Sequence, residues 1–411
     1  MAGTAATDAE APAPLHGSPH VPSGRQRRHA AHRLVGPGDE GPPQFSNHER
    51  ADLGGAHPAR GSRGDSATGC RFGFILWRLD SETAGYRKAE RDRLAATDAT
   101  AADPLAGFVT VFETATFRAM GTEVELLAAP SLRANVVEKV RADFEVVEEC
   151  LSRFRPESEL SELNASSGRP FQASPLLRQV LGEALAAAEE SDGLFDPVVL
   201  RAVEAAGYRE SIERVRGTLQ VQTEVRERAT YRDVEINADG SLLLPDGCGI
   251  DLGGFAKGWT VGLAAKRMEG CRSWVINAGG DLLTRGAGPD GDGWVIGIED
   301  PFSQGNDLAK VRLTDAALAT SSTMRRRWTT QDGPAHHLIN PRTQRPSESD
   351  LVSVSVVAQT VARAEVLAKT LLLRGKTGAL DYAESHAAPA LLIDEYGLVT
   401  ASRGMEAYLV V

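Results

Sequence analysis

The chain has 411 residues, of which 25% are charged, and its formal net charge is −11. This acidic balance argues against nucleic acid as a partner, because a phosphate backbone is bound by a basic surface. No apolar run reaches 18 residues and no apolar leader follows Met1, so we predict neither a transmembrane segment nor a signal peptide and expect a cytoplasmic protein. The four cysteines are widely spaced, which indicates free thiols in a reducing compartment.

Residues 1–106 differ in composition from the rest of the chain. They are rich in Ala, Gly, Pro, Ser, Arg and His, and their apolar residues show no sustained period. Such a segment cannot bury much apolar surface, so we predict that it is of low complexity and mostly disordered. Phe72–Trp77 is the exception and could form a short strand or docking element. The folded domain is therefore expected within residues 107–411, and its first strand near Val109.

The first half of this domain predicts two strands followed by helices. Val109–Ala128 reads as two strands on either side of a turn or bulge at Met120. Apolar residues recur at helical spacing in Ser131–Cys150, and Pro175–Ser191 has the same pattern. The polar segment between these helices, Leu151–Asn164, is expected to be irregular. Leu194–Val199 then leads into a further helical stretch that ends near Gly207.

The second half alternates strands and helices without a regular βαβ count. Val234–Leu244 predicts a hairpin, because Asp239-Gly240 is a strong turn signal. Val361–Leu373 predicts a helix that Gly375 ends. Further strands are expected at residues 273–277, 294–299, 316–320, 353–358, 389–393 and 407–411. This pattern favours the α+β class, with mixed sheets and flanking helices.

Two Gly-Gly turns, Asp251–Gly254 and Asn277–Asp281, lie on either side of one amphipathic helix that opens with Lys257. Glycines allow a backbone to approach a ligand closely, and a helix N-terminus suits an anion. The two Gly-Gly turns together with Lys257 predict a site for a phosphate-bearing ligand. The alternative is that both turns are ordinary connections and Lys257 is a solvated lysine. That alternative is weaker, because a cation in the first helical turn opposes the helix dipole.

Seven short blocks in order resemble one family over roughly Thr116–Leu373. It is the ApbE family, the FAD:protein FMN transferases. The blocks are M-G-T at Met120, S-R-F-R-P-E-S-E-L-S-E-L-N at Ser152, G-L-F-D-P at Gly193, D-L-G-G-F-A-K-G at Asp251, N-A-G-G-D at Asn277, A-T-S-S at Ala319 and H-H-L-I-N-P-R-T at His336. Each block is short, but their common order is a specific signal.

The resemblance implies a fold, a reaction and two partners. The fold is the ApbE-like, T-fold-like catalytic domain. Members bind FAD and a divalent metal, usually Mg²⁺, and release AMP while they attach FMN through a phosphoester bond to a Thr of a target flavoprotein. FAD and a flavoprotein with an acceptor Thr are therefore the expected partners. A weaker hypothesis is self-modification at Thr97–Thr100.

The resemblance also implies the residues of the site. His337 takes the proton from the attacking Thr hydroxyl, and Asp281 is the second expected catalytic residue. The expected FAD contacts are Met120, Ser158, Asn164, Phe195, Asp196, Lys257, Asp281, Ser321 and Ser322. Each has an alternative role: Met120 and Phe195 in core packing, the polar residues in turns or caps, and His337 in bonding the backbone. One arginine of residues 325–327 could also pair with a phosphate.

The expected metal ligands are the Gly254 carbonyl, Glu365 and Thr370, and here the sequence departs from the family. The family pattern A-D-A-L-A-T becomes A-R-A-E-V-L-A-K-T, so Lys369 replaces the expected Thr and Thr370 lies about 100° further around the helix. Lys369 could stand in for the charge of the metal or pair with Glu365. Asn340 and Gln344 depart from the pattern as well. These changes motivate the alternative function, a family member that binds FAD without transferring FMN.

Overall fold

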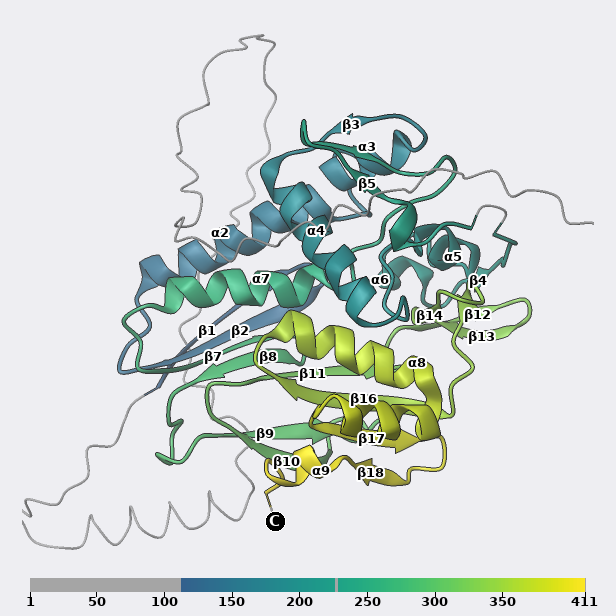
Figure 1. Cartoon of the computed structure of the whole chain (residues 1–411). Helices are drawn as coiled ribbons and strands as arrows, with labels where there is room; N and C mark the ends of the chain where they lie inside the picture. The colour runs from purple at the N-terminus through teal and green to yellow at the C-terminus, as the bar shows by residue number, and fades with distance from the viewer. Residues whose placement is uncertain (1–111, 226–227, 411) are drawn as a thin grey trace, which may run out of the picture. The chain divides into compact units, whose positions relative to one another are not determined.

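The computed structural model describes residues 112–225 and 228–410 (Figure 1). The predictions for residues 1–106, including Phe72–Trp77 and Thr97–Thr100, lie outside the described residues. Within the described part, Cys150, Cys248 and Cys271 are free thiols, as expected. No described helix combines the length and apolar character that a bilayer crossing requires.

One large sheet organises the described residues. Its strand order is β1-β2-β7-β8-β11-β16-β17-β18, and every neighbouring pair is antiparallel. The strands are β1 (Glu113–Ala119), β2 (Thr122–Ala129), β7 (Ser273–Ala278), β8 (Asp281–Arg285), β11 (Ala317–Ser322), β16 (Leu351–Ala358), β17 (Ala390–Asp394) and β18 (Val399–Ala401). The α+β class is confirmed. Mixed pairing, however, occurs in a smaller sheet, where β4 and β12 run parallel.

Both faces of the large sheet are covered (Figure 1). Helices α2 (Ala134–Leu151), α7 (Ala256–Ala265) and α8 (Val361–Ser385) pack on one face. The hairpin of β9 (Trp294–Glu299) and β10 (Asp307–Leu313) covers the other, where its apolar residues share a core with Val275, Leu318 and Leu391. The large sheet is therefore buried on both sides and forms a rigid platform.

The remaining elements are short apart from helix α4 (Pro175–Glu190), which packs against α2 and the 3₁₀ turn at Tyr231–Asp233. The other helices are α3 (Glu159–Ala165), α5 (Leu200–Ala205), α6 (Ile212–Val215) and α9 (Arg403–Glu406), with single 3₁₀ turns at Tyr231–Asp233 and Lys266–Met268. The small sheets are β3 (Phe171–Gln172) with β6 (Ser241–Leu243) and β5 (Glu235–Ile236), β13 (Gly333–His336) with β12 (Arg327–Thr330) and β4 (Leu219–Gln220), and β14 (Ile339–Asn340) with β15 (Arg345–Pro346). The predicted hairpin at Val234–Leu244 is confirmed by the pairing of β5 with β6.

Three sequence predictions of local structure are wrong. The segment predicted to be irregular contains α3, because Ser158 caps the helix and Leu160 and Leu163 are buried. Helix α8 does not end at Gly375. The backbone breaks there, with φ of 70°, and the helix resumes to Ser385 because Ala379 and Ala383 pack into the core. The end of the chain forms α9 and one isolated bridge between Val311 and Leu409 instead of a strand.

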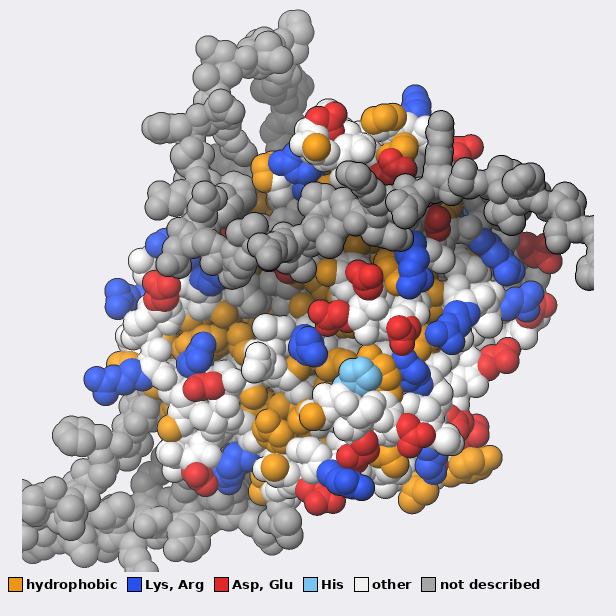
Figure 2. Space-filling view, viewed as in Figure 1, with side chains coloured by type: hydrophobic (Ala, Val, Ile, Leu, Met, Phe, Trp, Pro, Cys, Tyr) orange, Lys and Arg blue, Asp and Glu red, His pale blue; other side chains and the backbone are white. Residues whose placement is uncertain are grey.

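The described surface seen in Figure 2 carries acidic and basic side chains that are interspersed with one another. Neither sign forms an extended patch on that face.

Asn164, an expected FAD contact, instead holds the backbone before the first Gly-Gly turn. Its Nδ2 donates to the Ile250 carbonyl at 2.9 Å, and the Ile250 N–H donates to its Oδ1 at 2.7 Å. Asn164→Ala leaves two buried backbone groups without partners, so we expect the free energy of unfolding to fall by about 2–4 kcal/mol in urea denaturation. Ser166→Ala removes one bond at the end of α3 and should cost under about 1 kcal/mol. Equal losses for the two variants would contradict this role.

Candidate active site

A cavity of about 600 Å³ opens where the two Gly-Gly turns meet. Asp251, Gly253 and Gly254 line it from the first turn, and Gly279 and Asp281 line it from the second. A volume of this size is typical of small-molecule and cofactor sites. The two turns therefore line one shared cavity.

The first turn is held by an aspartate. Asp251 Oδ1 accepts a hydrogen bond from the Gly253 N–H at 2.7 Å, and its Oδ2 pairs with Arg153 Nε at 3.0 Å. Gly254 lies close to α8, since a Cβ there would lie 2.5 Å from Cε of Lys369. The backbone of this turn thus lies directly against a lysine side chain from α8.

The second turn needs glycine for its backbone conformation. Gly279 and Gly280 have φ of 68° and 99°, values that other residues rarely adopt. The Gly280 N–H donates to Oδ1 of Asn277 at 2.8 Å. The turn joins β7 to β8, and Asp281 begins β8 beside the cavity. Asp281 Oδ1 accepts from the Thr320 N–H at 3.2 Å, which fixes its carboxylate next to β11.

Helices α7 and α8 cross closely at Gly258. A Cβ there would lie 2.8 Å from the backbone nitrogen of Ala362, so only glycine permits this approach. The crossing brings Glu365 of α8 next to the start of α7, where Glu365 Oε2 accepts from the Gly258 N–H at 3.3 Å. Lys369 follows one turn later on the same side of α8.

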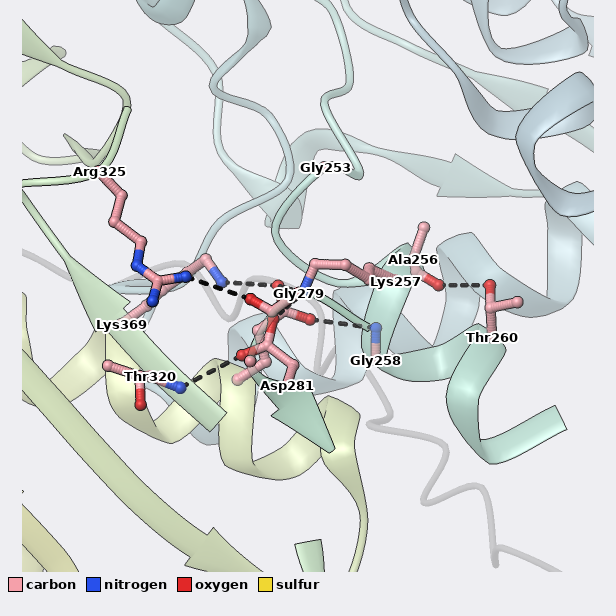
Figure 3. A network of polar contacts seen from close by, with 12 residues as sticks. Gly253, Ala256, Lys257, Gly258, Thr260, Gly279, Asp281, Thr320, Arg325 and Lys369 are labelled. Carbon is pink, nitrogen blue, oxygen red and sulfur yellow. Dashed lines mark hydrogen bonds and ion pairs between the residues drawn. The ribbon is translucent and has the colours of Figure 1, made fainter. Parts of the chain in front are cut away.

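Four charges meet at this crossing: Lys257, Asp281, Glu365 and Lys369. Figure 3 shows Lys257, Asp281 and Lys369 of this cluster. Lys257 forms an ion pair with Asp281 and lies 3.7 Å from Glu365 Oε1. Lys369 Nζ lies 3.2 Å from the same Oε1. All four side chains are at most 15% exposed. Two ammonium groups and two carboxylates thus form one compact cluster, in which each charge has an opposite neighbour.

Burial and pairing shift the pKa values of this cluster. Burial lowers the pKa of Lys257 to about 8, against the opposing effect of Glu365. Burial also lowers the pKa of Lys369, and Glu365 again opposes it. For Glu365, burial favours the neutral acid, but Lys257 and Lys369 outweigh it, and the pKa is lowered. The carboxylate is therefore ionised at neutral pH and holds both ammonium groups in place.

His337 lines the same cavity. Burial lowers its pKa well below the ordinary value, and Arg326 and Lys369 lower it further. Its Nδ1 is buried and has no hydrogen-bond partner among the residues that the structure describes. The imidazole is therefore neutral at neutral pH, and a nitrogen is free to accept a proton from a bound molecule.

Comparison with known proteins identifies the family. A model of the ApbE family matches residues 120–392. The chain belongs to the ApbE family. It is 30% identical to the FAD:protein FMN transferase of Vibrio cholerae, over 61% of this chain and 76% of that protein. It is 31% identical to the FAD:protein FMN transferase of Rhodobacter capsulatus, over 64% of this chain and 51% of that protein. A solved flavin transferase ApbE from Vibrio cholerae is similar with a TM-score of 0.62 and 26% identity, over 73% of this chain and 100% of that one.

The structure of this ApbE-family chain brings most of the expected site residues together. Those that line the cavity come from both Gly-Gly turns, from the sheet and from the surrounding loops. They are Met120, Phe195, Asp196, Gly254, Lys257, Asp281, Ser321, Ser322, His337 and Glu365. Of the arginine run at 325–327, Arg325 and Arg326 line the cavity, whereas Arg327 lies on β12 and is exposed.

Three expected site residues do not line the cavity. Ser158 is fully buried, donates to the Ser152 carbonyl and caps α3. Asn164 holds Ile250, as described above. Thr370 donates its hydroxyl to the Val366 carbonyl within α8. For Thr370 the cause is the helical period, since one residue beyond Lys369 turns the side chain away from the cavity.

Several cavity residues were missed in the sequence, among them Arg153 and Tyr208. The Arg153 side chain is buried and pairs with Asp251. Its Cζ lies 4.7 Å from the ring centroid of Tyr208, and both residues line the cavity. The Nη2 atom of Arg153 has no hydrogen-bond partner among the described residues. Arg153 lies inside the S-R-F block, so its charge was available as a signal. No local signal marks Tyr208, which the chain brings to the cavity from the loop after α5.

The residues present do not fit the divalent metal that the family resemblance implies. Lys369 lies against both Gly254 and Glu365, two of the three expected ligands. The third, Thr370, points away. In the described part of the chain, no three His, Cys, Asp or Glu side chains cluster as a metal site would require. An ammonium group has only donors, whereas Mg²⁺ needs a shell of oxygen ligands.

The pH dependence of stability tests whether Asp196 is buried beside the cavity. Burial raises its pKa from 3.8 to about 6, although it accepts hydrogen bonds from the Val198 and Tyr231 N–H groups. Between pH 6 and 4 the folded chain keeps a proton that the unfolded chain releases, so this group's contribution to the free energy of unfolding rises as pH falls. We expect the free energy of unfolding of the wild type, relative to that of Asp196→Asn, to rise by about 2–3 kcal/mol from pH 7 to pH 4.

Urea denaturation across this pH range measures that difference. Asp239→Asn is the control of opposite sign, because hydrogen bonds from Ser241 lower the pKa of Asp239. Its contribution should be lost as pH falls. A difference curve for Asp196→Asn that stays flat between pH 7 and pH 4 would contradict a buried Asp196 beside the cavity.

Proposed function

We propose that residues 107–411 form an FAD:protein FMN transferase domain. FAD is cleaved, FMN is attached through a phosphoester bond to a Thr of a target flavoprotein, and AMP is released. The observation that carries this proposal is the cavity that both Gly-Gly turns line in a chain of the ApbE family. Lys257, Lys369 and Arg326 line this cavity and offer cationic groups to a ligand with a diphosphate.

In this proposal the FAD diphosphate binds at the N-terminus of α7. The side chain of Lys257, in the first turn of α7, and that of Arg326 line the cavity and offer charged donors to the phosphate oxygens. The hydroxyl groups of Ser321 and Ser322, at the end of β11, donate to phosphate oxygens. Met120, Phe195 and Tyr208 provide apolar and aromatic walls of the same cavity against which ring systems pack.

The reaction is a phosphoryl transfer from an anhydride to an alcohol. The Thr oxygen of the target attacks the phosphorus on the FMN side, the new P–O bond forms, and the anhydride bond to the AMP phosphate breaks. AMP leaves with the bridging oxygen. The Thr proton passes to the imidazole of His337, which lines the cavity and is neutral. The cationic side chains offset the charge that develops on the leaving phosphate.

The alternative is a family member that binds FAD without transferring FMN. One observation favours it: Lys369 occupies the metal position expected from the family. We assign no step to Mg²⁺, because the residues present do not fit that ion.

One assay separates the two functions. The purified chain is incubated with FAD and a panel of Thr-bearing acceptor peptides, and AMP is quantified by chromatography while peptide masses are measured. The transferase predicts AMP and covalent FMN in equal amounts, because each transfer releases one AMP. FAD that is bound, while neither product forms on any peptide, would establish the alternative instead.

His337 and its neighbour provide a matched pair of variants. We expect His337→Gln to lower the transfer rate by about 10²–10⁴-fold, the usual contribution of a positioned base, with little change in FAD affinity. His336→Gln is the control: His336 Nε2 bonds the Ser347 carbonyl at 3.0 Å, and the residue does not line the cavity. Equal transfer rates in the two variants would remove His337 from the mechanism.

A further inference from the structure

Lys369 lies between Gly254 and Glu365, two residues that the family resemblance implies as metal ligands. Its Nζ is 3.2 Å from Glu365 Oε1. A Cβ added at Gly254 would lie 2.5 Å from its Cε and 3.2 Å from its Nζ. The side chain is 15% exposed and lines the cavity. The ammonium group therefore lies against the first Gly-Gly turn, at the end of the cavity where Lys257 begins α7.

The same geometry removes the oxygen ligands that a divalent cation would need. Glu365 Oε1 faces both Lys257 and Lys369, and Oε2 accepts from the Gly258 N–H. Asp281 is paired with Lys257. A divalent ion would have to displace these contacts and lie beside two ammonium groups. Electrostatic repulsion and the loss of both ion pairs oppose such an exchange.

We propose that Lys369 replaces the divalent cation of this site, so that the chain binds the diphosphate of FAD without a metal. Lys369 and Lys257 contact the diphosphate from two helices, and Glu365 positions both ammonium groups. A fixed ammonium group binds a phosphate as a point charge, as lysine does in other phosphate sites. This inference rests on the proposed function only for the identity of the dinucleotide.

The alternative for Lys369 is a purely structural ion pair with Glu365, one helical turn away. Such a pair stabilises α8 and contributes nothing to ligand binding. The two roles differ in a measurable way. Only the phosphate-binding role makes FAD affinity depend on the charge at position 369, and only that role makes FAD affinity independent of Mg²⁺.

The experiment measures FAD affinity of the full chain by quenching of flavin fluorescence, once with EDTA and once with excess Mg²⁺. For the wild type we expect dissociation constants that agree within about twofold. Lys369→Thr restores the hydroxyl of the family pattern. In EDTA we expect its affinity to fall about 10- to 100-fold, the loss of a charged hydrogen bond, and Mg²⁺ to recover part of it.

Two further variants separate charge from side-chain shape. Lys369→Met keeps the length of the side chain but not its charge, so we expect the same loss in EDTA and no recovery with Mg²⁺. Lys369→Arg keeps the charge and should bind FAD within about fivefold of the wild type. Circular dichroism and thermal unfolding of each variant show that it is folded before its affinity is compared.

Each outcome decides between the roles. Wild-type affinity that falls tenfold or more in EDTA would overturn the proposal, and so would unchanged affinity of the folded Lys369→Met and Lys369→Thr variants. FAD that binds in EDTA without AMP release would overturn the transferase function alone. FAD that binds under neither condition would overturn both proposals.

Discussion

The site depends on one constraint: the buried charges of Lys257, Asp281, Glu365 and Lys369 must neutralise one another. An unpaired ammonium or carboxylate group would be costly at this depth, so each needs an opposite charge within a few ångströms. The close crossing of α7 and α8 at Gly258 provides that arrangement. If this crossing were wider, Glu365 would no longer reach Lys257 at the start of α7 and would pair only with Lys369 of its own helix. The position of the positive charge in the cavity is thus fixed by helix packing.

The large antiparallel sheet positions helices α7 and α8 where they cross. The hairpin of β7 and β8 forms the second Gly-Gly turn, and α7 packs against these same strands. Both turns therefore reach the cavity from opposite ends of one short unit of chain. Helix α8 packs on β11 and β16 and delivers Glu365 and Lys369 from a distant part of the sequence. Because the sheet is covered on both faces, these elements have little freedom to move apart, which suits a site that works by positioning.

This chain keeps the frame of the ApbE family but differs in the cation at its centre. Its cavity, its two Gly-Gly turns and His337 lie where the sequence blocks imply. The metal ligands do not, because Lys369 lies against Gly254 and Glu365 while Thr370 bonds within its own helix. One change in the A-R-A-E-V-L-A-K-T segment, Lys369 at the position of the family's Thr, is enough to exchange an expected ligand for an ammonium group. Family membership therefore describes the site only in part.

The sequence by itself determined the fold class, most of the strands and helices, and the pairing of two glycine turns around Lys257, because these follow from local periodicity and turn chemistry. It also placed Glu365 and Lys369 on one helix face, since residues four apart are neighbours there. Only the tertiary structure decided which polar residues face the cavity. Ser158 and Asn164 carry the right chemistry in the right block, yet they serve a helix cap and a backbone clamp. Tyr208 reaches the cavity from the loop after α5, and no local pattern marks it. Arg153 lies in the S-R-F block, but only its pairing with the distant Asp251 shows that it faces the cavity.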